Sequence, residues 1–202
     1  MADIIYLFEG TPYFNITNQC PCHCTFCIRE KKAAVGEAKK MWHERQPNFE
    51  AVRAAIDAFD WAEATEAVFC GYGEPTSELA LLLETAAYMK QEHSAVKLRL
   101  NTNGLSDLIH GEPTAKRICR YMDAVSVSLN EVTSEKYDEI TGNIFPGRAF
   151  DAMLRFTREC VECCRDVRMT VVDLLSAEEI EQARKLCESV GAKFKVRAFV
   201  SE

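Results

Sequence analysis

Three cysteines near the amino terminus carry the strongest chemical signal in this chain of 202 residues. Cys20, Cys24 and Cys27 stand in a Cys-x3-Cys-x2-Cys spacing, and the residue before the last of them is the aromatic Phe26. Cysteine thiolates hold iron–sulfur clusters, and a 4Fe-4S cubane needs four ligands for full ligation. Three thiolates on one short loop therefore leave one iron open to a ligand from outside the protein. An open iron indicates chemistry as well as structure.

Zinc is the main alternative occupant of such a loop. A structural zinc site needs four closed ligands, usually as two pairs far apart in the sequence, and no clean second pair follows here. Cys22 lies within the same loop, so other triples can be drawn from its four cysteines. The x3-x2 spacing and Phe26 favour a cluster on Cys20, Cys24 and Cys27.

Composition limits the class of protein. With 48% hydrophobic residues the chain can bury a core, and we expect one domain over residues 1–202. A net charge of -7 argues against broad nucleic-acid binding, which needs a basic surface. Ten cysteines, no hydrophobic leader and no apolar run long enough to cross a bilayer favour a reducing cytoplasm and no membrane association.

Strand patterns alternate with helical patterns along most of the chain, which is typical of a parallel sheet covered by helices. Six strands are predicted, near residues 13–17, 67–70, 97–102, 124–129, 167–172 and 194–200. Helices are predicted near residues 50–62, 77–93, 114–122, 149–164 and 178–190. At about 30 residues per strand–helix unit there is room for six units and not eight. We therefore expect an α/β fold, an open, partial (β/α)6 TIM-like barrel with the cysteine loop after its first strand.

Two boundaries of the last predicted helix have sequence support. Ser176 and Glu179 have the spacing of a capping box, and Gly191 stands where the helix should end. At the other end of the chain, residues 4–7 can add a short strand that pairs with residues 13–16.

The charged stretch 28–47 shows little periodicity and is predicted to be a long, solvated loop. Loops at the carboxyl ends of barrel strands usually shape active sites. Trp42 and His43 are therefore weak candidates for substrate contacts.

Alternation along the strands predicts which side chains face the helices and which face the barrel interior. On the last strand, Phe194, Val196 and Ala198 should face the helices. The inward set is polar or cationic: Tyr13, Asn15, Thr17, Arg99, Asn101, Ser126, Ser128, Asn130, Arg168, Thr170, Lys195 and Arg197. An uncompensated buried charge costs several kcal/mol, so we expect the interior to hold ligands or water. Four cations inside an acidic protein favour anionic ligands.

Two motifs resemble those of a known family. The string YFNITNQCPCHCTFCIR, residues 13–29, and the later GYGEPT resemble the signatures of the radical SAM superfamily. The narrower resemblance is to the small radical SAM proteins named for a frequent TatD-nuclease gene neighbour. It implies that the amino and carboxylate groups of S-adenosylmethionine chelate the open iron. It also implies that Gly71, Tyr72, Gly73 and Glu74 form the loop that receives the amino group of the bound methionine, with Tyr72 in place of the usual second glycine.

The resemblance extends to weaker positions. Thr102 and Asn103 lie in a TNG-like strand end, and Ser128 lies in an SLD-like segment where Asn130 replaces the acid. Arg168 stands where relatives often carry a cation that can take the methionine carboxylate. The set implied to bind the cofactor, in part also from alternation, is Phe26, Gly71, Tyr72, Gly73, Glu74, Asn101, Thr102, Ser128, Asn130 and Arg168. Arg99, Lys195 and Arg197 remain for the substrate, and no catalytic residue is assigned.

By this resemblance the expected function is reductive cleavage of S-adenosylmethionine to a 5′-deoxyadenosyl radical, which abstracts hydrogen from an unidentified, anionic substrate. A one-electron donor such as flavodoxin or ferredoxin is the expected partner, and the substrate is a small molecule or a protein. The alternatives are a non-catalytic iron–sulfur or zinc module for electron transfer or partner binding, and an activase of the glycyl-radical type. Because the chain ends just after the sixth strand, no carboxyl-terminal domain for an auxiliary cluster is expected.

The remaining cysteines have two interpretations. Cys160, Cys163 and Cys164 share one helix face and, with Cys187, could in principle hold a second cluster, but free cysteines in a packed core are favoured. Cys70 ends a predicted strand beside the glycine-glutamate loop. Its thiol could donate a hydrogen atom there, although core packing is again favoured.

Overall fold

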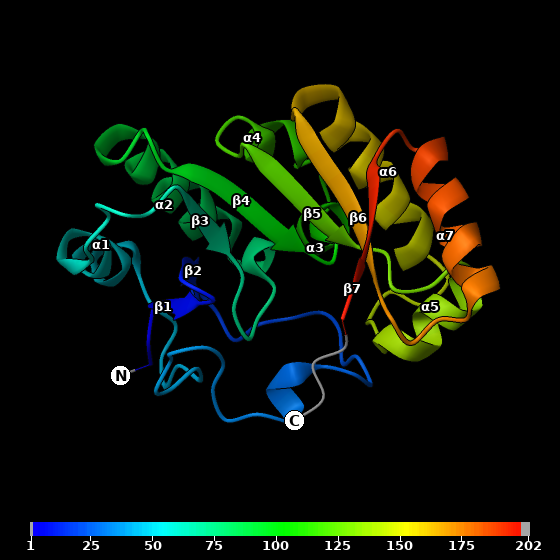
Figure 1. Cartoon of the computed structure of the whole chain (residues 1–202), viewed down its shortest axis with the longest axis horizontal. Helices are drawn as coiled ribbons and strands as arrows, with labels where there is room; N and C mark the ends of the chain where they lie inside the picture. The colour runs from blue at the N-terminus through cyan, green and yellow to red at the C-terminus, as the bar shows by residue number, and fades with distance from the viewer. Residues whose placement is uncertain (1, 199–202) are drawn as a thin grey trace.

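The computed structural model describes residues 2–198, which build one seven-stranded sheet with its strands in chain order (Figure 1). The antiparallel pair β1–β2 forms one edge, and every neighbouring pair from β2 to β7 is parallel. The strands are β1 (Ile5–Phe8), β2 (Thr11–Phe14), β3 (Glu66–Phe69), β4 (Lys97–Thr102), β5 (Ala124–Ser128), β6 (Asp166–Val172) and β7 (Lys193–Arg197). The predicted open, partial (β/α)6 barrel is confirmed.

Helices connect the parallel strands. They are α1 (Phe49–Ala58), α2 (Leu79–Glu92), α3 (Ser106–His110), α4 (Ala115–Cys119), α5 (Ser134–Thr141), α6 (Ala149–Cys163) and α7 (Ala177–Ser189), with 3-10 turns η1 (Ile28–Glu30) and η2 (Pro75–Glu78). All five predicted helices are present with ends that differ by up to four residues, whereas α3 and α5 were not predicted. The predicted capping box of α7 forms between Ser176 and Glu179, and Gly191 follows the helix at φ 78°.

The two faces of the sheet differ as alternation predicts. Leu98, Leu100, Val125 and Val127 are fully buried in the core between the sheet and the helices. Edge strand β7 departs from the prediction because nothing pairs with its outer side among residues 2–198: Val196 is 37% exposed. The predicted end of this strand, residues 199 and 200, lies outside the described residues.

The strand predicted at residues 13–17 is β2, which begins and ends earlier than predicted, at Thr11–Phe14. A two-residue turn, Glu9 and Gly10, joins β1 to β2, and both residues have positive φ, 50° and 75°. Two consecutive positive φ angles fit the right-handed twist of a hairpin. The predicted strand stops at Phe14, because the next residue leaves the ladder and its side chain takes other partners.

Asn15 is that residue, and its buried carboxamide joins three segments. Its Nδ2 donates to Met41 O at 2.7 Å and to Asp3 O at 3.2 Å, and its Oδ1 accepts from Tyr72 N at 3.2 Å. These bonds attach the stretch after the cysteine loop and the loop after β3 to the end of β2.

The prediction of a long loop at residues 28–47 is confirmed, since it contains only the 3-10 turn η1, but the loop is not solvated throughout. Met41 is fully buried against Tyr6 and Tyr72, and Arg29 is 9% exposed. In Figure 1 this blue segment runs below the sheet, in the direction in which the arrows of β4, β5 and β7 point. The contacts that order the stretch come from distant residues, which periodicity does not detect. Within residues 2–198, no helix is both long and apolar enough to span a bilayer.

We expect Asn15→Ala to lower the free energy of unfolding by about 2–4 kcal/mol, because three hydrogen bonds are lost and buried backbone groups stay unpaired. Urea denaturation followed by circular dichroism measures the change. Asn48→Ala is the control: it removes only the exposed cap of α1, whose Oδ1 accepts from Ala51 N at 3.0 Å, and should cost about 1 kcal/mol. Equal losses in the two variants would contradict the joining role of Asn15.

Candidate cluster and cofactor site

The cysteine loop lies at the carboxyl edge of the barrel and is held there by the end of α5. His23 N donates to Thr141 O at 2.9 Å, and Thr25 N donates to Ile140 O at 3.0 Å. The next residue, Gly142, has φ 51°, and a Cβ there would lie 3.1 Å from His23 O. The loop is therefore fixed by a helix that the sequence did not predict.

The four thiols of this loop differ in burial and in pKa. Cys22 is 3% exposed, whereas Cys20, Cys24 and Cys27 are half-buried. Contact with the Cys22 thiol lowers the pKa of Cys20 and Cys24, while these two thiols and burial raise the pKa of Cys22. Burial raises the pKa of Cys27. The three cysteines of the x3-x2 spacing are thus the more accessible ones, and Cys22 is the buried one.

Within residues 2–198, no three His, Cys, Asp or Glu side chains converge as ligands of a single metal ion. A cubane distributes its thiolates over separate irons and does not require such convergence. Phe26, predicted beside the cofactor, is half-buried in the same loop.

The glycine-glutamate loop after β3 packs against the segment between β2 and the cysteines. A Cβ on Gly71 would lie 2.3 Å from Asn15 Oδ1, and a Cβ on Gly73 would lie 2.4 Å from Thr17 O. Glu74 N donates to Gln19 O at 2.7 Å across the same contact. The glycines are therefore needed so that the two backbones can meet.

The Glu74 carboxylate serves this packing instead of facing a ligand. It is 4% exposed and accepts from Thr76 N at 3.1 Å, Thr76 Oγ1 at 2.7 Å, Thr102 Oγ1 at 2.7 Å and Asn103 N at 2.7 Å. Burial raises the pKa of Glu74, and these four donors oppose that rise. The expectation that this carboxylate receives the methionine ammonium stays a prediction, as does the role of Thr102, which donates to Glu74 Oε1. The backbone of Gly71, Tyr72 and Gly73 remains for that role.

A cavity of about 460 Å³ occupies the barrel interior below this loop. Asn101, Ser126 and Arg168 line it at one level, as the strand register requires, and Cys70 and Thr170 belong to the same wall. The Asn101 Oδ1 is buried without a partner. Burial raises the pKa of the Cys70 thiol, so it keeps its proton at neutral pH. Cys70 faces this cavity, which the favoured sequence interpretation did not anticipate.

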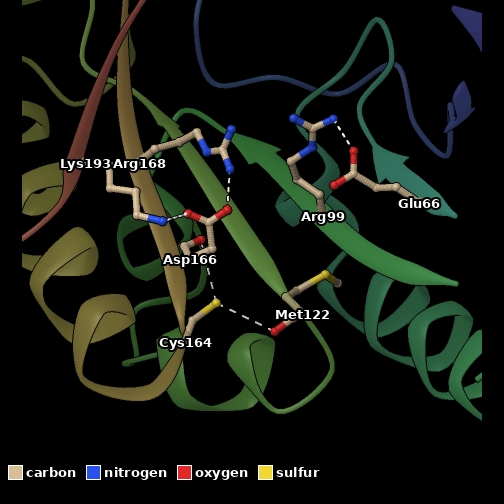
Figure 2. Close-up of polar contacts among 7 residues, drawn as sticks. All are labelled: Glu66, Arg99, Met122, Cys164, Asp166, Arg168 and Lys193. Atoms are coloured by element: carbon tan, nitrogen blue, oxygen red, sulfur yellow. Dashed lines mark hydrogen bonds and ion pairs between the residues drawn. The ribbon is translucent and has the colours of Figure 1, made fainter. Parts of the chain in front are cut away.

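Two of the four predicted inward cations are paired with carboxylates (Figure 2). Arg99 contacts Glu66 at 2.5 Å, and Arg168 pairs with Asp166, which Lys193 also contacts at 2.9 Å. Lys193 and Arg168 together lower the pKa of Asp166. Both arginines line the cavity, and each keeps a buried Nε without a partner.

The other two cations, Lys195 and Arg197, also line the cavity, from the exposed edge strand β7. Neither makes an ion pair with another residue in the described part of the chain. All four cations thus share one cavity, which Glu9 also lines, and the two on β7 form no ion pair within residues 2–198.

The remaining predicted residues lie either at the carboxyl edge of the barrel or away from the cavity. Ser128 is half-buried at the end of β5, and Asn130 is 6% exposed at φ 62° with its Oδ1 unpartnered. Trp42 packs edge-on against Tyr72, and His43 Nε2 hydrogen-bonds Asn15 O at 2.8 Å. Trp42 and His43 do not line the cavity, and their substrate contacts stay a prediction.

The carboxyl-terminal cysteines pack mostly within the fold. Cys160 and Cys187 are fully buried, and the Cys164 thiol lies 3.6 Å from Met122 O (Figure 2). Exposed Cys163 donates to Glu159 O at 3.0 Å. Cys119 on α4 adjoins Cys160, Cys163 and Cys164, a neighbour that helix periodicity alone could not supply.

Comparison with known proteins agrees with this geometry. The Radical SAM superfamily model matches residues 14–187, so the chain belongs to the radical SAM superfamily. Members use a 4Fe-4S cluster and S-adenosylmethionine, and these are the cofactors of this fold. No curated protein sequence matches the chain. The narrower TatD-associated group stays a prediction.

Solved structures share the fold at low identity. Streptococcus suis SuiB bound to precursor peptide SuiA gives a TM-score of 0.63 at 17% identity, covering 92% of this chain and 38% of SuiB. SuiB bound to S-adenosylmethionine gives 0.62 at 18% identity, covering 94% and 40%. A radical SAM methyltransferase from Sphaerobacter thermophilus gives 0.60 at 16% identity, covering 96% and 68%. The chain therefore spans well under half the length of SuiB.

We expect Cys20→Ala, Cys24→Ala and Cys27→Ala each to abolish cluster assembly, and Cys22→Ala to retain it. The reason is that only the first three match the ligand spacing, while Cys22 is a buried, neutral thiol. Iron and labile sulfide per chain after anaerobic reconstitution measure the difference, with Cys119→Ser as a control. Normal iron in Cys24→Ala together with loss in Cys22→Ala would show that a different triple binds the cluster.

Proposed function

We propose that this protein is a radical SAM enzyme in which Cys20, Cys24 and Cys27 hold a 4Fe-4S cluster and S-adenosylmethionine occupies the fourth iron. The observation that carries the proposal is the cysteine loop, held at the carboxyl edge of the barrel against the glycine-glutamate loop. When bound, these cofactors supply a 5′-deoxyadenosyl radical that abstracts hydrogen from a substrate. The electron comes from a donor such as flavodoxin or ferredoxin in a reducing cytoplasm.

Different residues at the carboxyl edge bind different groups of the cofactor. The backbone of Gly71–Gly73 accepts the methionine ammonium, because the Glu74 carboxylate is already saturated. The unpartnered Oδ1 atoms of Asn101 and Asn130 are acceptors for hydroxyl or amine groups of the cofactor. Arg168 offers its remaining guanidinium N–H groups to the methionine carboxylate while it stays paired with Asp166. Ser128 completes this rim.

The substrate is an anion held by Arg99, Lys195 and Arg197. In the cavity the cations outnumber the carboxylates even after Arg99 and Arg168 have found partners. Lys195 and Arg197 are exposed, and they mark the open side of the cavity, where a charged group can enter without losing all its water. A small molecule or an acidic segment of a protein satisfies this chemistry, which leaves an activase as one form of the proposal.

The proposed chemistry is tested by anaerobic incubation of the reconstituted protein with dithionite and S-adenosylmethionine, followed by mass spectrometry. We expect 5′-deoxyadenosine from the wild type and from Cys119→Ser, and at least a hundredfold less from Cys24→Ala, because without a cluster no electron reaches the sulfonium. Isolation of the protein with zinc and no labile sulfide would instead favour the non-catalytic metal module.

The cationic cavity is tested through Cys70, which lies in its wall. At alkaline pH, the anion iodoacetate should alkylate Cys70 faster, relative to neutral iodoacetamide, than it alkylates exposed Cys163. Lys195→Gln and Arg197→Gln should each lower this ratio at Cys70 about two- to fivefold, the scale of one partly screened charge, about 0.4–1 kcal/mol. Peptide mass spectrometry gives the rates. Lys185→Gln, on the exposed side of α7, is the matched control.

If the iodoacetate to iodoacetamide ratio at Cys70 is the same in wild type, Lys195→Gln and Arg197→Gln, the anionic-substrate proposal is wrong. That result would leave the cluster chemistry untouched.

A further inference from the structure

Tyr137 on α5 carries a hydroxyl group that the described protein does not use. Its side chain is fully buried, and the hydroxyl has no hydrogen-bond partner among residues 2–198. The ring packs edge-on against Phe150, with centroids 5.6 Å apart. Phenylalanine would make the same packing without burying an unpaired polar group. Buried groups of this kind are rare in folded proteins, and each requires an explanation.

The position of Tyr137 indicates where a partner belongs. The final residues of the same helix, Ile140 and Thr141, accept the backbone hydrogen bonds that hold the cysteine loop. The tyrosine belongs to the same core as Cys22 and Cys24, and burial first and then the charges of these two thiols raise the pKa of its hydroxyl. One helix therefore holds the residues on both sides of Cys24 with its end and carries a buried, unpartnered hydroxyl group one turn before that end.

We propose that the Tyr137 hydroxyl donates a hydrogen bond to a sulfur atom at the Cys24 corner of the cluster and so sets the cluster's reduction potential. The inference rests on the proposed ligation by Cys20, Cys24 and Cys27. Tyr137 acts through the cluster and touches no substrate, so it is a positioning residue.

General chemistry gives the direction of the effect. A phenol is protonated at neutral pH and can donate one hydrogen bond. Hydrogen bonds to cluster sulfurs are among the features that set the reduction potential, as outer-shell partners do at other metal sites. The bond stabilises the reduced cluster more than the oxidised one, because reduction adds negative charge to the sulfurs. Apolar surroundings such as Phe150 strengthen the interaction.

The test is the midpoint potential of the reconstituted cluster, measured by redox titration with electron paramagnetic resonance. Tyr137→Phe removes the donor and keeps the ring, so the potential should shift to a more negative value with iron and sulfide per chain unchanged. Tyr88→Phe is the matched control, because its hydroxyl donates to Asp57 Oδ1 at 2.6 Å on the exposed side of the protein. The potential of this control should equal that of the wild type.

A second variant keeps the inference open to test if Tyr137→Phe does not assemble a cluster. Placing 3-fluorotyrosine at position 137 alone retains the hydroxyl and makes it a stronger donor, so the potential should shift to a more positive value. A wild-type potential in either loaded variant would overturn the role of Tyr137 and leave the cluster assignment standing. A wild-type protein that binds no iron and sulfide would overturn the assignment itself, and with it this inference.

Discussion

The site depends on a contact between two backbones, the segment after β2 and the loop after β3. Gly71 and Gly73 allow this contact, because a Cβ on either would lie within 2.4 Å of an atom of residues 15–17. Two hydrogen bonds cross it, from Glu74 N to Gln19 O and from Tyr72 N to Asn15 Oδ1. The contact places the cysteine loop beside the loop that is proposed to hold the methionine ammonium. Both halves of the cofactor site therefore share one rigid support.

Glu74 extends this support to the next strand. Its buried carboxylate bonds Thr102 and Asn103 at the end of β4, and Asn103 Nδ2 in turn lies 3.7 Å from Cys22 Sγ. A buried carboxylate is stable only when its lone pairs are satisfied, and four donors satisfy this one. The acid of the motif thus links the end of β4 to the loop after β3.

Charge is distributed unevenly within the barrel. Glu66 and Asp166 stand at the first positions of β3 and β6 and compensate the arginines of neighbouring positions, Arg99 and Arg168. Lys195 and Arg197 of β7 form no such ion pair within the described residues, whereas Lys193 of the same strand shares Asp166 with Arg168. These ion pairs make the barrel interior nearly neutral at the end where β3 and β6 begin. The remaining positive charge lies at the open side of the cavity, where a ligand can enter.

Alternation made much of the fold predictable. β4 has the predicted bounds, Lys97–Thr102, and polar and apolar residues alternate along it from Lys97 to Asn101. The same reasoning placed Arg99 and Arg168 in the interior. It also contained the signal for one missed ion pair, since Asp166 and Arg168 lie two positions apart and so share a face.

Other features were beyond sequence reasoning for physical reasons. Helix α5 is short and polar, with only Tyr137 and Thr141 buried, so it shows no clear apolar stripe. The stretch 28–47 is ordered by contacts of Met41 with Tyr6 and Tyr72, which are distant in the chain. The saturation of Glu74 depends on Thr102 and Asn103, which come together with it only after the sheet has formed. In each case tertiary contacts decide the outcome.

The central claim is that three thiolates leave one iron of a cubane open for S-adenosylmethionine. The most direct measurement is the electron paramagnetic resonance spectrum of the reduced, reconstituted protein during titration with S-adenosylmethionine. The account predicts a 4Fe-4S signal whose g values change and saturate as the ligand binds, and no cluster signal in Cys24→Ala. A 4Fe-4S signal that stays unchanged at saturating S-adenosylmethionine would contradict it.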